Sequence, residues 1–228
     1  MRNDRRSPAN SAVLNPTEAA GHTHGLSLFY TDLDRDYVQV REIAKMGRAA
    51  VDSNEVFFDG LPVPLEDRIG EEGKGFQYLL HGLNPERILV AAEAVGIGER
   101  AVALASRYAR ERIVFGRPIG QNQAIQHPLA DSWMALHAAW LTCMHAAWCY
   151  DNGKPCGAEA NTAKYVGAEA AFKACERAVM THGGMGYARE FHVERLLREV
   201  LIPRIAPVSP QLILCYIAER VLDLPRSY

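Results

Sequence analysis

A succession of long helical patterns after Gly73 most constrains what this chain can fold into. Short breaks at Phe115–Pro118 and Asp151–Pro155 separate the patterns, and both contain the glycine and proline that typically end helices. Hydrophobic residues recur at helical spacing over four segments, at about 84–112, 121–150, 157–181 and 210–222. Long helices joined by short connections lie antiparallel, so we expect a mainly α fold, an up-down four-helix bundle.

The first of these segments is expected to begin as a new helix at Asn84. Asn84 is a favourable N-cap residue and Pro85 suits the first helical position. We therefore predict that a short helix over 76–83 ends before a longer helix starts. Gly96 and Gly98 in the longer helix would let a neighbouring helix approach closely.

The second and third segments carry the residues expected to form the core of the bundle. In the second, Trp133, Trp140 and Trp148 have the spacing of a core stripe, a role that we favour over ligand binding. Three histidines on that segment lack carboxylate partners and are interpreted as structural: His127, His137 and His145. The third segment is rich in alanine, which favours tight helix–helix packing.

Residues 25–72 show β-patterns before the helices begin. Short strands are predicted near 25–32, 38–40 and 53–58. Asp59–Gly60 is expected to form a turn after the third strand. Three or four strands are too few to bury a sheet on their own, so we interpret this segment as part of a β-domain.

Residues 1–24 have the composition of a disordered tail. His22 and His24 lack carboxylate or cysteine partners, so we predict no metal site there. The predicted division is therefore a tail at 1–24, a partial middle β-domain at 25–72 and a helical bundle domain at 73–226.

The composition argues against several classes of protein. A hydrophobic fraction of 48% and a charged fraction of 23% are typical of a soluble globular protein, and a formal net charge of -2 argues against a nucleic-acid partner. No apolar run approaches the length of a membrane span, and the N-terminus lacks the core of a signal peptide. The five cysteines show no CxxC spacing, so we expect reduced, mostly buried cysteines in a cytoplasmic protein.

Two loops at helix ends contain residues suited to a ligand. In the first, Arg112, Phe115 and backbone amides surround one turn, an arrangement suited to a polyphosphate. The alternative is a helical hairpin whose arginines cap carbonyls and face water. In the second, Gly183 and Gly184 either end a helix or let a ligand approach the backbone. The residues alone leave both pairs of alternatives open.

Six stretches resemble acyl-CoA dehydrogenases, in the order that this family has them. They are VFFDGLPVP, GEEGKGF, NPERI, YARERIVFGRPIGQNQAIQHPLAD, HGGMGYAREFHVERLLRE and the final helix. The resemblance runs from about Gly25 to the C-terminus. It implies the closing strands of the family's middle β-domain, followed by the family's C-terminal helical bundle.

The resemblance also implies where flavin adenine dinucleotide (FAD) binds. The residues that match FAD contacts of the family are Arg112, Phe115, Asn122, Gln123, Gly183, Gly184, Ser209 and Gln211. In the family, the Gly183–Gly184 position lies against the adenosine diphosphate part of FAD and is reached from a neighbouring subunit. Val114 stands where many relatives have a hydroxyl residue, so we expect that contact to be lost.

The reaction implied is removal of two hydrogens across the Cα–Cβ bond of an acyl-CoA thioester. It needs a carboxylate base, a flavin that takes the hydride, and donors to the thioester oxygen. Many relatives carry the base in a Tyr-Glu-Gly-Thr string before the last helix, where this chain has Ala206-Pro207-Val208-Ser209. Pro207 has no N–H to hold the thioester carbonyl, which is a second departure from the family.

Another branch of the family, which includes isovaleryl- and long-chain-specific enzymes, carries the glutamate in an L-x-x-E-R string that matches Leu83–Arg87. We therefore expect Glu86 to be the catalytic base and Arg87 to line the substrate side. The alternative for Glu86 is a first-turn glutamate favoured by the helix dipole.

The resemblance implies an oxidoreductase of fatty acid metabolism with FAD as cofactor, acyl-CoA as substrate and an electron-transferring flavoprotein as partner. The family's N-terminal helical domain and the first half of its β-domain find no match here. We therefore expect a truncated gene product, a mis-called start or a subunit completed by another polypeptide, and a chain that is inactive alone. The alanine-rich helix and the tryptophan stripe predict a homo-oligomer, dimer or tetramer. The alternatives are a flavin-dependent monooxygenase of the same fold and a non-catalytic oligomerisation module.

Overall fold

The computed structural model describes residues 15–16 and 25–227 of the chain. The predicted disordered tail, with His22 and His24, lies outside the described residues apart from positions 15 and 16. Two compact units form, and the boundary between them falls after Gly82.

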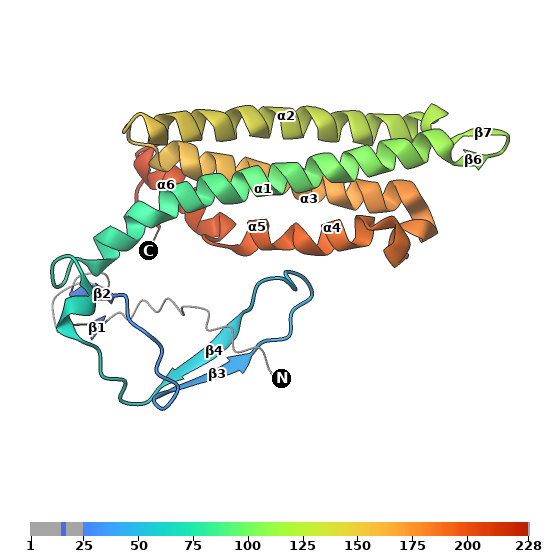
Figure 1. Ribbon diagram of the computed structural model, residues 1–228. Coiled ribbons are helices and arrows are strands. Elements are labelled where there is room, and N and C mark those ends of the chain that lie inside the picture. The colour runs from blue at the N-terminus through green and yellow to red at the C-terminus, as the bar shows by residue number, and fades with distance from the viewer. Residues whose placement is uncertain (1–14, 17–24, 228) are drawn as a thin grey trace. The chain divides into compact units, whose positions relative to one another are not determined.

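The first unit contains short antiparallel strands (Figure 1). Strands β1 (Asn15–Pro16), β2 (Leu26–Phe29) and β5 (Arg68–Ile69) form a sheet in the order β1-β2-β5. Strands β3 (Val38–Glu42) and β4 (Asn54–Phe58) form a separate pair. The three strands predicted from the sequence are confirmed as β2, β3 and β4, whereas the two-residue strands β1 and β5 were not predicted.

The strands of the first unit bury little of their own surface. Every residue of β4 is exposed, and the side chains of Phe57 and Phe58 are 50% and 47% exposed. In the described part of this unit, the buried hydrophobic residues are Leu28 and Val38. These small sheets therefore leave their aromatic residues open to solvent, as expected for so few strands.

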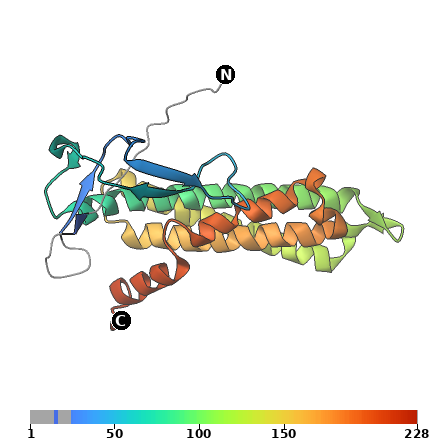
Figure 2. The same cartoon turned by 90° about the horizontal axis from the view of Figure 1, so that it is seen from below.

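The long helices of the second unit lie side by side as a bundle (Figure 1). Helices α1 (Gly75–Glu111), α2 (Gln123–Asp151) and α3 (Gly157–His182) are the long members, and α1 begins in the first unit. The fourth member consists of α4 (Val193–Glu199) and α5 (Leu201–Ile205) along α3. Figure 2 shows the last helix, α6 (Pro210–Arg220), leaving the bundle at one end. The predicted mainly α fold, a four-helix bundle preceded by a partial antiparallel β-domain, is confirmed, although α4 and α5 rather than the final helix run along α3.

Small residues allow the helices of the bundle to approach closely. The alanines of α3 are confirmed as packing residues, since Ala163, Ala171 and Ala174 are all completely buried. Ala171 lies against Gly98 of α1, where an added Cβ would come within 3.0 Å of the Ala171 Cα. Gly96, by contrast, has open space around it, so only one of the two glycines marks a close helix contact.

The predicted helix boundary at Asn84 is wrong, because α1 runs without interruption from Gly75 to Glu111 with Pro85 inside it. A proline removes one backbone hydrogen bond from a helix, and the helix-forming residues on both sides continue the helix across the gap. The Asn84 side chain does not cap a helix. Its Oδ1 atom accepts a hydrogen bond of 2.8 Å from Nη1 of Arg87.

The predicted tryptophan core stripe of α2 is also wrong. Trp133, Trp140 and Trp148 are 59%, 39% and 50% exposed. The buried residues of this helix are Leu129, Ser132, Leu136, Ala139, Cys143, Ala146 and Cys149. Both faces of α2 carry apolar residues at helical spacing, and spacing alone does not decide which face is turned inward.

Residues 193–220 include a helical stretch that is apolar enough to cross a membrane by length and composition alone, with a mean hydropathy of 1.5. It is the one such stretch in the described residues. In the structure it comprises the three short helices α4, α5 and α6, and Val193, Val200 and Ile213 from it are buried in the bundle. A single stretch of this kind does not by itself indicate a membrane protein.

The five cysteines are free thiols, as predicted. Four are buried, and Cys215 is partly exposed. Burial raises the pKa of the Cys175 thiol to about 12, which is consistent with a packing role.

Candidate functional site

The loop between α1 and α2 is a small hairpin at one end of the bundle (Figure 1). Strand β6 (Ile113–Val114) pairs with β7 (Arg117–Pro118), and Phe115 and Gly116 form the turn with positive φ angles of 51° and 77°. The chain returns through a hydrogen bond of 2.9 Å from the Ile119 amide to the Arg112 carbonyl. The predicted tight loop is therefore a hairpin.

The tip of this hairpin presents an aromatic ring and a guanidinium to solvent. Phe115 is 101% exposed, and Arg112 at the base of the hairpin is exposed as well. A left-handed backbone costs a bulky residue free energy, so the exposed ring of Phe115 is held in a strained position without burial in return. Packing within this chain does not account for that placement.

Asn122 fixes the entry into α2 through its side chain. Its Oδ1 atom accepts a 2.8 Å hydrogen bond from Arg117, and its Nδ2 atom donates a 2.9 Å hydrogen bond to the Ile119 carbonyl. The next residue, Gln123, is exposed at the first position of the helix. The hairpin thus brings Arg112, Phe115, Asn122 and Gln123 together at the same end of the bundle.

The glycine pair follows α3 at that end. Gly183 has φ 60° and ψ −135°, a conformation that essentially only glycine adopts. A Cβ on Gly184 would meet no atom of the described residues within 4 Å, whereas a Cβ on the nearby Gly186 would collide with the Val179 carbonyl. Gly183 and Gly186 therefore have a structural reason within the chain, and Gly184 has none.

His182 supports the glycine pair from inside the bundle. Its ring is 5% exposed, stacks on Tyr108 with a centroid distance of 4.2 Å, and donates from Nδ1 to the Ala178 carbonyl at 2.8 Å. Burial lowers the pKa of His182, so the neutral imidazole is favoured. Nothing in the sequence pattern distinguishes this histidine. Beside it lies a cavity of about 280 Å³ lined by both charge signs, including Arg100, Arg107 and Glu190.

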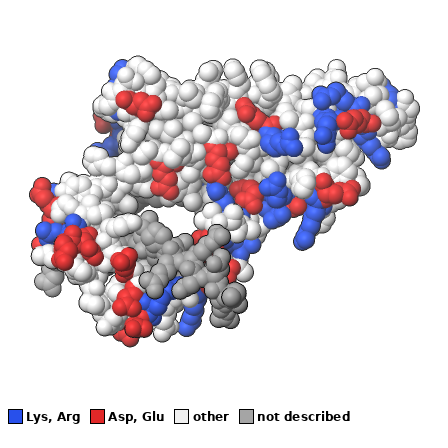
Figure 3. Space-filling view, in the orientation of Figure 1, with Lys and Arg blue, Asp and Glu red and all other residues white. Residues whose placement is uncertain are grey.

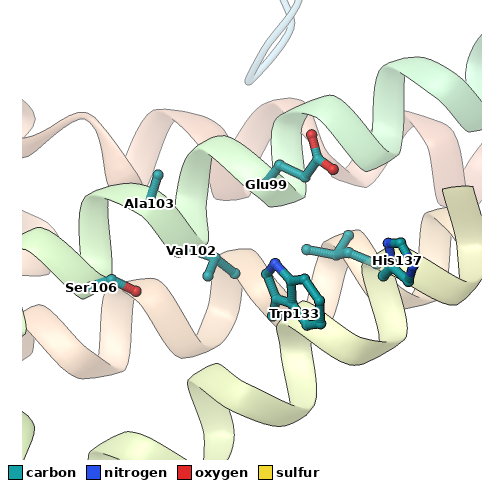
Figure 4. Close-up of a pocket in the computed structure, with 7 residues that line it drawn as sticks. Glu99, Val102, Ala103, Ser106, Trp133 and His137 are labelled. Carbon is teal, nitrogen blue, oxygen red and sulfur yellow. The ribbon is translucent and has the colours of Figure 1, made fainter.

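A second groove, of about 350 Å³, lies between α1 and α2 (Figure 4). Trp133 and His137 from α2 stack with their rings at 2° to each other, and Glu99 of α1 lies across from them. Its other lining residues are Val102, Ala103, Ser106 and Leu136. None of the predicted site residues lines it.

The remaining predicted residues lie toward the opposite end of the bundle. Glu86 is exposed on α1, but Arg87 is only 9% exposed. The Nε atom of Arg87 has no hydrogen-bond partner among the described residues, and burial lowers its pKa. Within its own unit Arg87 is thus an interior residue with an unused donor.

Ser209 and Gln211 lie at the start of α6. Ser209 is the N-cap, and its Oγ atom accepts a hydrogen bond of 3.3 Å from the Leu212 amide. Gln211 is exposed in the first turn. The preceding loop, residues 206–209, is held by Lys164 of α3, whose Nζ atom donates to the Val208 carbonyl at 2.7 Å. Sequence reasoning missed Lys164, although its spacing of four residues from Ala160 and Ala168 places it on the apolar face of α3.

The candidate residues therefore form two groups rather than one. From Glu86 to Glu111, α1 rises about 38 Å at 1.5 Å per residue. Glu86, Arg87, Ser209 and Gln211 lie near one end of this length, and the hairpin and the glycine pair lie at the other. Among the described residues, no cluster of three or more His, Cys, Asp or Glu side chains is placed to hold a metal ion.

Comparison with known proteins gives a family match that covers most of the bundle. Residues 73–222 match the acyl-CoA dehydrogenase C-terminal domain family. An acyl-CoA dehydrogenase of Mycobacterium tuberculosis is 40% identical over 176 residues, which are 76% of this chain and 45% of that protein. The caffeyl-CoA reductase-Etf complex subunit CarC of Acetobacterium woodii is 35% identical over 191 residues, which are 83% of this chain and 50% of that protein.

The fold matches as well. The butyryl-CoA dehydrogenase of Megasphaera elsdenii superposes with a TM-score of 0.88 at 33% identity, covering 92% of this chain and 55% of that chain. The chain spans about half the length of the curated relatives it matches. The family match and the shared fold together show that this chain belongs to the acyl-CoA dehydrogenase family.

Proposed function

We propose that this chain acts in a flavoprotein that dehydrogenates an acyl-CoA thioester across its Cα–Cβ bond. The observation that carries the proposal is the tip of the β6–β7 hairpin, where Phe115 is strained and fully exposed beside the exposed Arg112. An exposed cation beside an exposed ring suits the phosphates and rings of a dinucleotide. FAD, when bound, supplies the hydride acceptor of the reaction.

Arg112, Phe115, Asn122 and Gln123 are the proposed FAD contacts on the hairpin. Gly184 supports a second part of the same surface, since a Cβ there would meet nothing in this chain and the backbone is open to a ligand. Gly183 is proposed as its neighbour in that contact. Val114 remains a departure from the family, with no hydroxyl to offer the flavin.

Ser209, Gln211, Glu86 and Arg87 are the proposed residues of the opposite end. Glu86 is the proposed base for the α-proton, and its exposed carboxylate is free to meet a substrate. Arg87 is the proposed substrate-side residue, and its buried Nε atom has no hydrogen-bond partner among the described residues. Since the two groups are about 38 Å apart along α1, one FAD cannot touch both within one chain.

We therefore propose a homo-oligomer, dimer or tetramer, in which the hairpin end of one copy completes the Glu86 end of another. The exposed apolar face of α2 supports this assembly. Between Asp131 and Asp151 the helix has no charged residue, and Figure 3 shows a mostly uncharged surface along it. Exposed apolar surfaces of this extent mark association sites.

Three further features belong to the proposal. The domain division is a β-part over 25–72 and a bundle over 73–226, which the family match over 73–222 supports. The proposed electron acceptor is an electron-transferring flavoprotein, and the Acetobacterium woodii relative is by its name a subunit of a complex with an Etf. The proposed location is the cytoplasm, where the free thiols remain reduced.

The first test is FAD binding and turnover by the purified 228-residue chain, measured as absorbance in the flavin band and as dye reduction with acyl-CoA thioesters. We expect weak FAD binding and no turnover from this chain alone, because much of the family's isoalloxazine and acyl pocket lies in segments that it does not match. Joining it to the N-terminal half of a full-length relative should restore both. Lack of FAD binding in the joined protein would contradict the proposal.

The second test addresses the base. In the joined, active protein, Glu86→Gln should retain FAD and lower turnover by about 10²-fold or more, the scale expected for losing a general base. Glu99→Gln, on an exposed glutamate of the same helix, is the matched control and should leave turnover unchanged. Full activity of Glu86→Gln would reject Glu86 as the base.

A non-catalytic oligomerisation module is the second candidate, favoured by the same apolar face of α2. It predicts stable association of the chain without any bound FAD, even in the joined protein.

A further inference from the structure

Lys164 is a charged residue in the interior of the bundle. It lies on α3 and is 1% exposed, the largest side chain that is almost fully buried among the described residues. Lysine is almost never fully buried without a partner, because taking an ammonium out of water is costly. Its position therefore requires a structural or functional reason.

The partners of Lys164 are two backbone carbonyls. Its Nζ atom lies 2.7 Å from the Val208 carbonyl oxygen and 3.4 Å from the Arg204 carbonyl oxygen. Arg204 is in the last turn of α5, where carbonyls have no partner within the helix. Val208 directly precedes Ser209, the N-cap of α6. One ammonium group thus connects the end of one helix to the start of the next.

The loop between these helices has little else to hold it. The backbone hydrogen bonds at its two edges, from Ala206 to Ile202 and from Ile213 to Ser209, stay within the adjoining helices. The Arg204 side chain is separately fastened to α3 by a bidentate pair with Glu169 at 2.7 and 3.2 Å. In the described part of the chain, the bonds from Lys164 are the ones that fix the loop itself to the bundle.

No carboxylate is bonded to Lys164 among the residues that the structure describes. The nearby charges are Glu169 on its own helix, Arg87 on α1, and Arg204 on α5, which is already paired with Glu169. Burial lowers the pKa of Lys164 from 10.5 to about 8, with Glu169 raising it and Arg87 lowering it. Arg87 in turn faces Tyr216 of α6 and Cys156. The hydrogen-bond partners of the Lys164 ammonium are therefore backbone carbonyl groups of Arg204 and Val208.

We propose that Lys164 is the positioning residue of the 206–209 loop. By fixing the carbonyls of Arg204 and Val208, it sets where Ser209 and Gln211 stand at the start of α6. This inference rests on the proposed function in one respect, namely that Ser209 and Gln211 are proposed there as FAD contacts. The role of Lys164 in holding the loop is independent of FAD.

The experiment is hydrogen exchange on the 228-residue chain and on its Lys164→Met variant, which keeps the length of the side chain and removes its donors. The reporters are the amides of Leu212 and Ile213, which bond to Ser209. The substituted thioether would leave two part-buried carbonyls without their partner, so the loop turns toward water and these amides exchange about tenfold faster or more. Lys173→Met, on an exposed lysine of the same helix, is the control and should change nothing.

A pH profile of the unaltered chain gives a readout that does not depend on any variant. Opening the loop returns Lys164 to water, where its pKa is 10.5, so opening takes up a proton above about pH 8. After correction for intrinsic exchange, protection of Leu212 and Ile213 should rise by up to about tenfold per pH unit from about pH 8 to 10. Amides of Ile125 and Gln126, at the other end of the bundle, should show no such rise.

FAD titration separates this proposal from the proposed function. Faster exchange in Lys164→Met together with weaker FAD binding supports both. Faster exchange in a chain that binds no FAD, also when joined to the N-terminal half of a relative, supports the role of Lys164 and contradicts the flavin function. Unchanged exchange of Leu212 and Ile213 in Lys164→Met, or the same pH profile in variant and parent, overturns the role of Lys164.

Discussion

Gly98 and Gly96 form a matched pair for testing how closely the helices of the bundle pack. Both lie in α1, two residues apart, and neither has a positive φ angle. A Cβ on Gly98 would lie 2.6 Å from Cδ2 of Leu136 and 3.0 Å from Cα of Ala171. A Cβ on Gly96 would meet nothing within 4 Å. The two substitutions by alanine therefore share the helix-propensity gain and differ in the packing cost.

The magnitudes follow from these distances. Replacing glycine by alanine inside a helix stabilises by about 1 kcal/mol, which is the whole effect expected for Gly96→Ala. In Gly98→Ala, the Leu136 side chain can rotate, but Ala171 contributes backbone, so α1 and α3 must move apart. Overpacking of this kind costs about 1–3 kcal/mol. We expect Gly98→Ala to be less stable than Gly96→Ala by that amount.

Denaturant unfolding of both variants, followed by circular dichroism, measures the difference. Gly96→Ala should raise the midpoint with an unchanged m-value, and Gly98→Ala should leave it unchanged or lower it. Equal stabilisation by both alanines would show that α1 and α3 are not in contact at Gly98, and would refute the packing described for Ala171.

Three further predictions concern Lys164, Ser209 and the tryptophans. Because the pKa of Lys164 is lowered to about 8 in the folded chain, the unfolded chain binds more protons at this residue above that pH, so Lys164 should contribute a rise of about 3 kcal/mol in the free energy of unfolding between about pH 8 and 10.5. Buried thiols such as Cys175, whose pKa is raised, act in the opposite direction in the same range, so the contribution of Lys164 is the difference between the denaturation curves of the parent and of Lys164→Met, and a constant difference over this range would contradict it. Ser209→Ala removes the hydrogen bond to the Leu212 amide and should cost about 1 kcal/mol of stability in urea unfolding, whereas a cost near zero would argue against the cap. Trp133 and Trp148 are exposed, so replacing both by glutamine should change the stability of the monomer by no more than about 0.5 kcal/mol per site. The same replacements should weaken association, measured by sedimentation velocity. An oligomer that is unaltered by them would show that α2 is not part of the interface.

The sequence predicts the long helices well because each carries several signals that agree. For α3, the turn at Asp151–Pro155, the alanine run and the glycine pair all indicate the same ends, and the helix spans Gly157–His182. At Asn84 and Pro85 a local cap signal competes with helix-forming residues on both sides, and the flanking residues prevail. Local rules predict a helix start there, but they do not include the cooperativity of a helix already formed.

The site residues are predicted less completely for a different reason. Arg112, Phe115 and Gly183 stand in recognisable strings, so a resemblance finds them. Lys164 stands in an alanine-rich helix with no such string, and its importance depends on which face of α3 is buried and on which carbonyls come near it. These are relations between segments 40 or more residues apart, which periodicity within one helix does not contain.

The tryptophans of α2 show how a correct local pattern can lead to a wrong prediction of which residues are buried. Their helical spacing indicates an apolar face, and that interpretation of the pattern is sound, because the face exists. The inference that fails is that an apolar face must lie in the core of its own chain. In this helix, small residues such as Ala139, Ala146 and Cys143 take the inner face, since α1 and α3 come too close for large rings. Large apolar side chains then remain outside, and an exposed apolar face of this kind is stable in water when a second surface covers it.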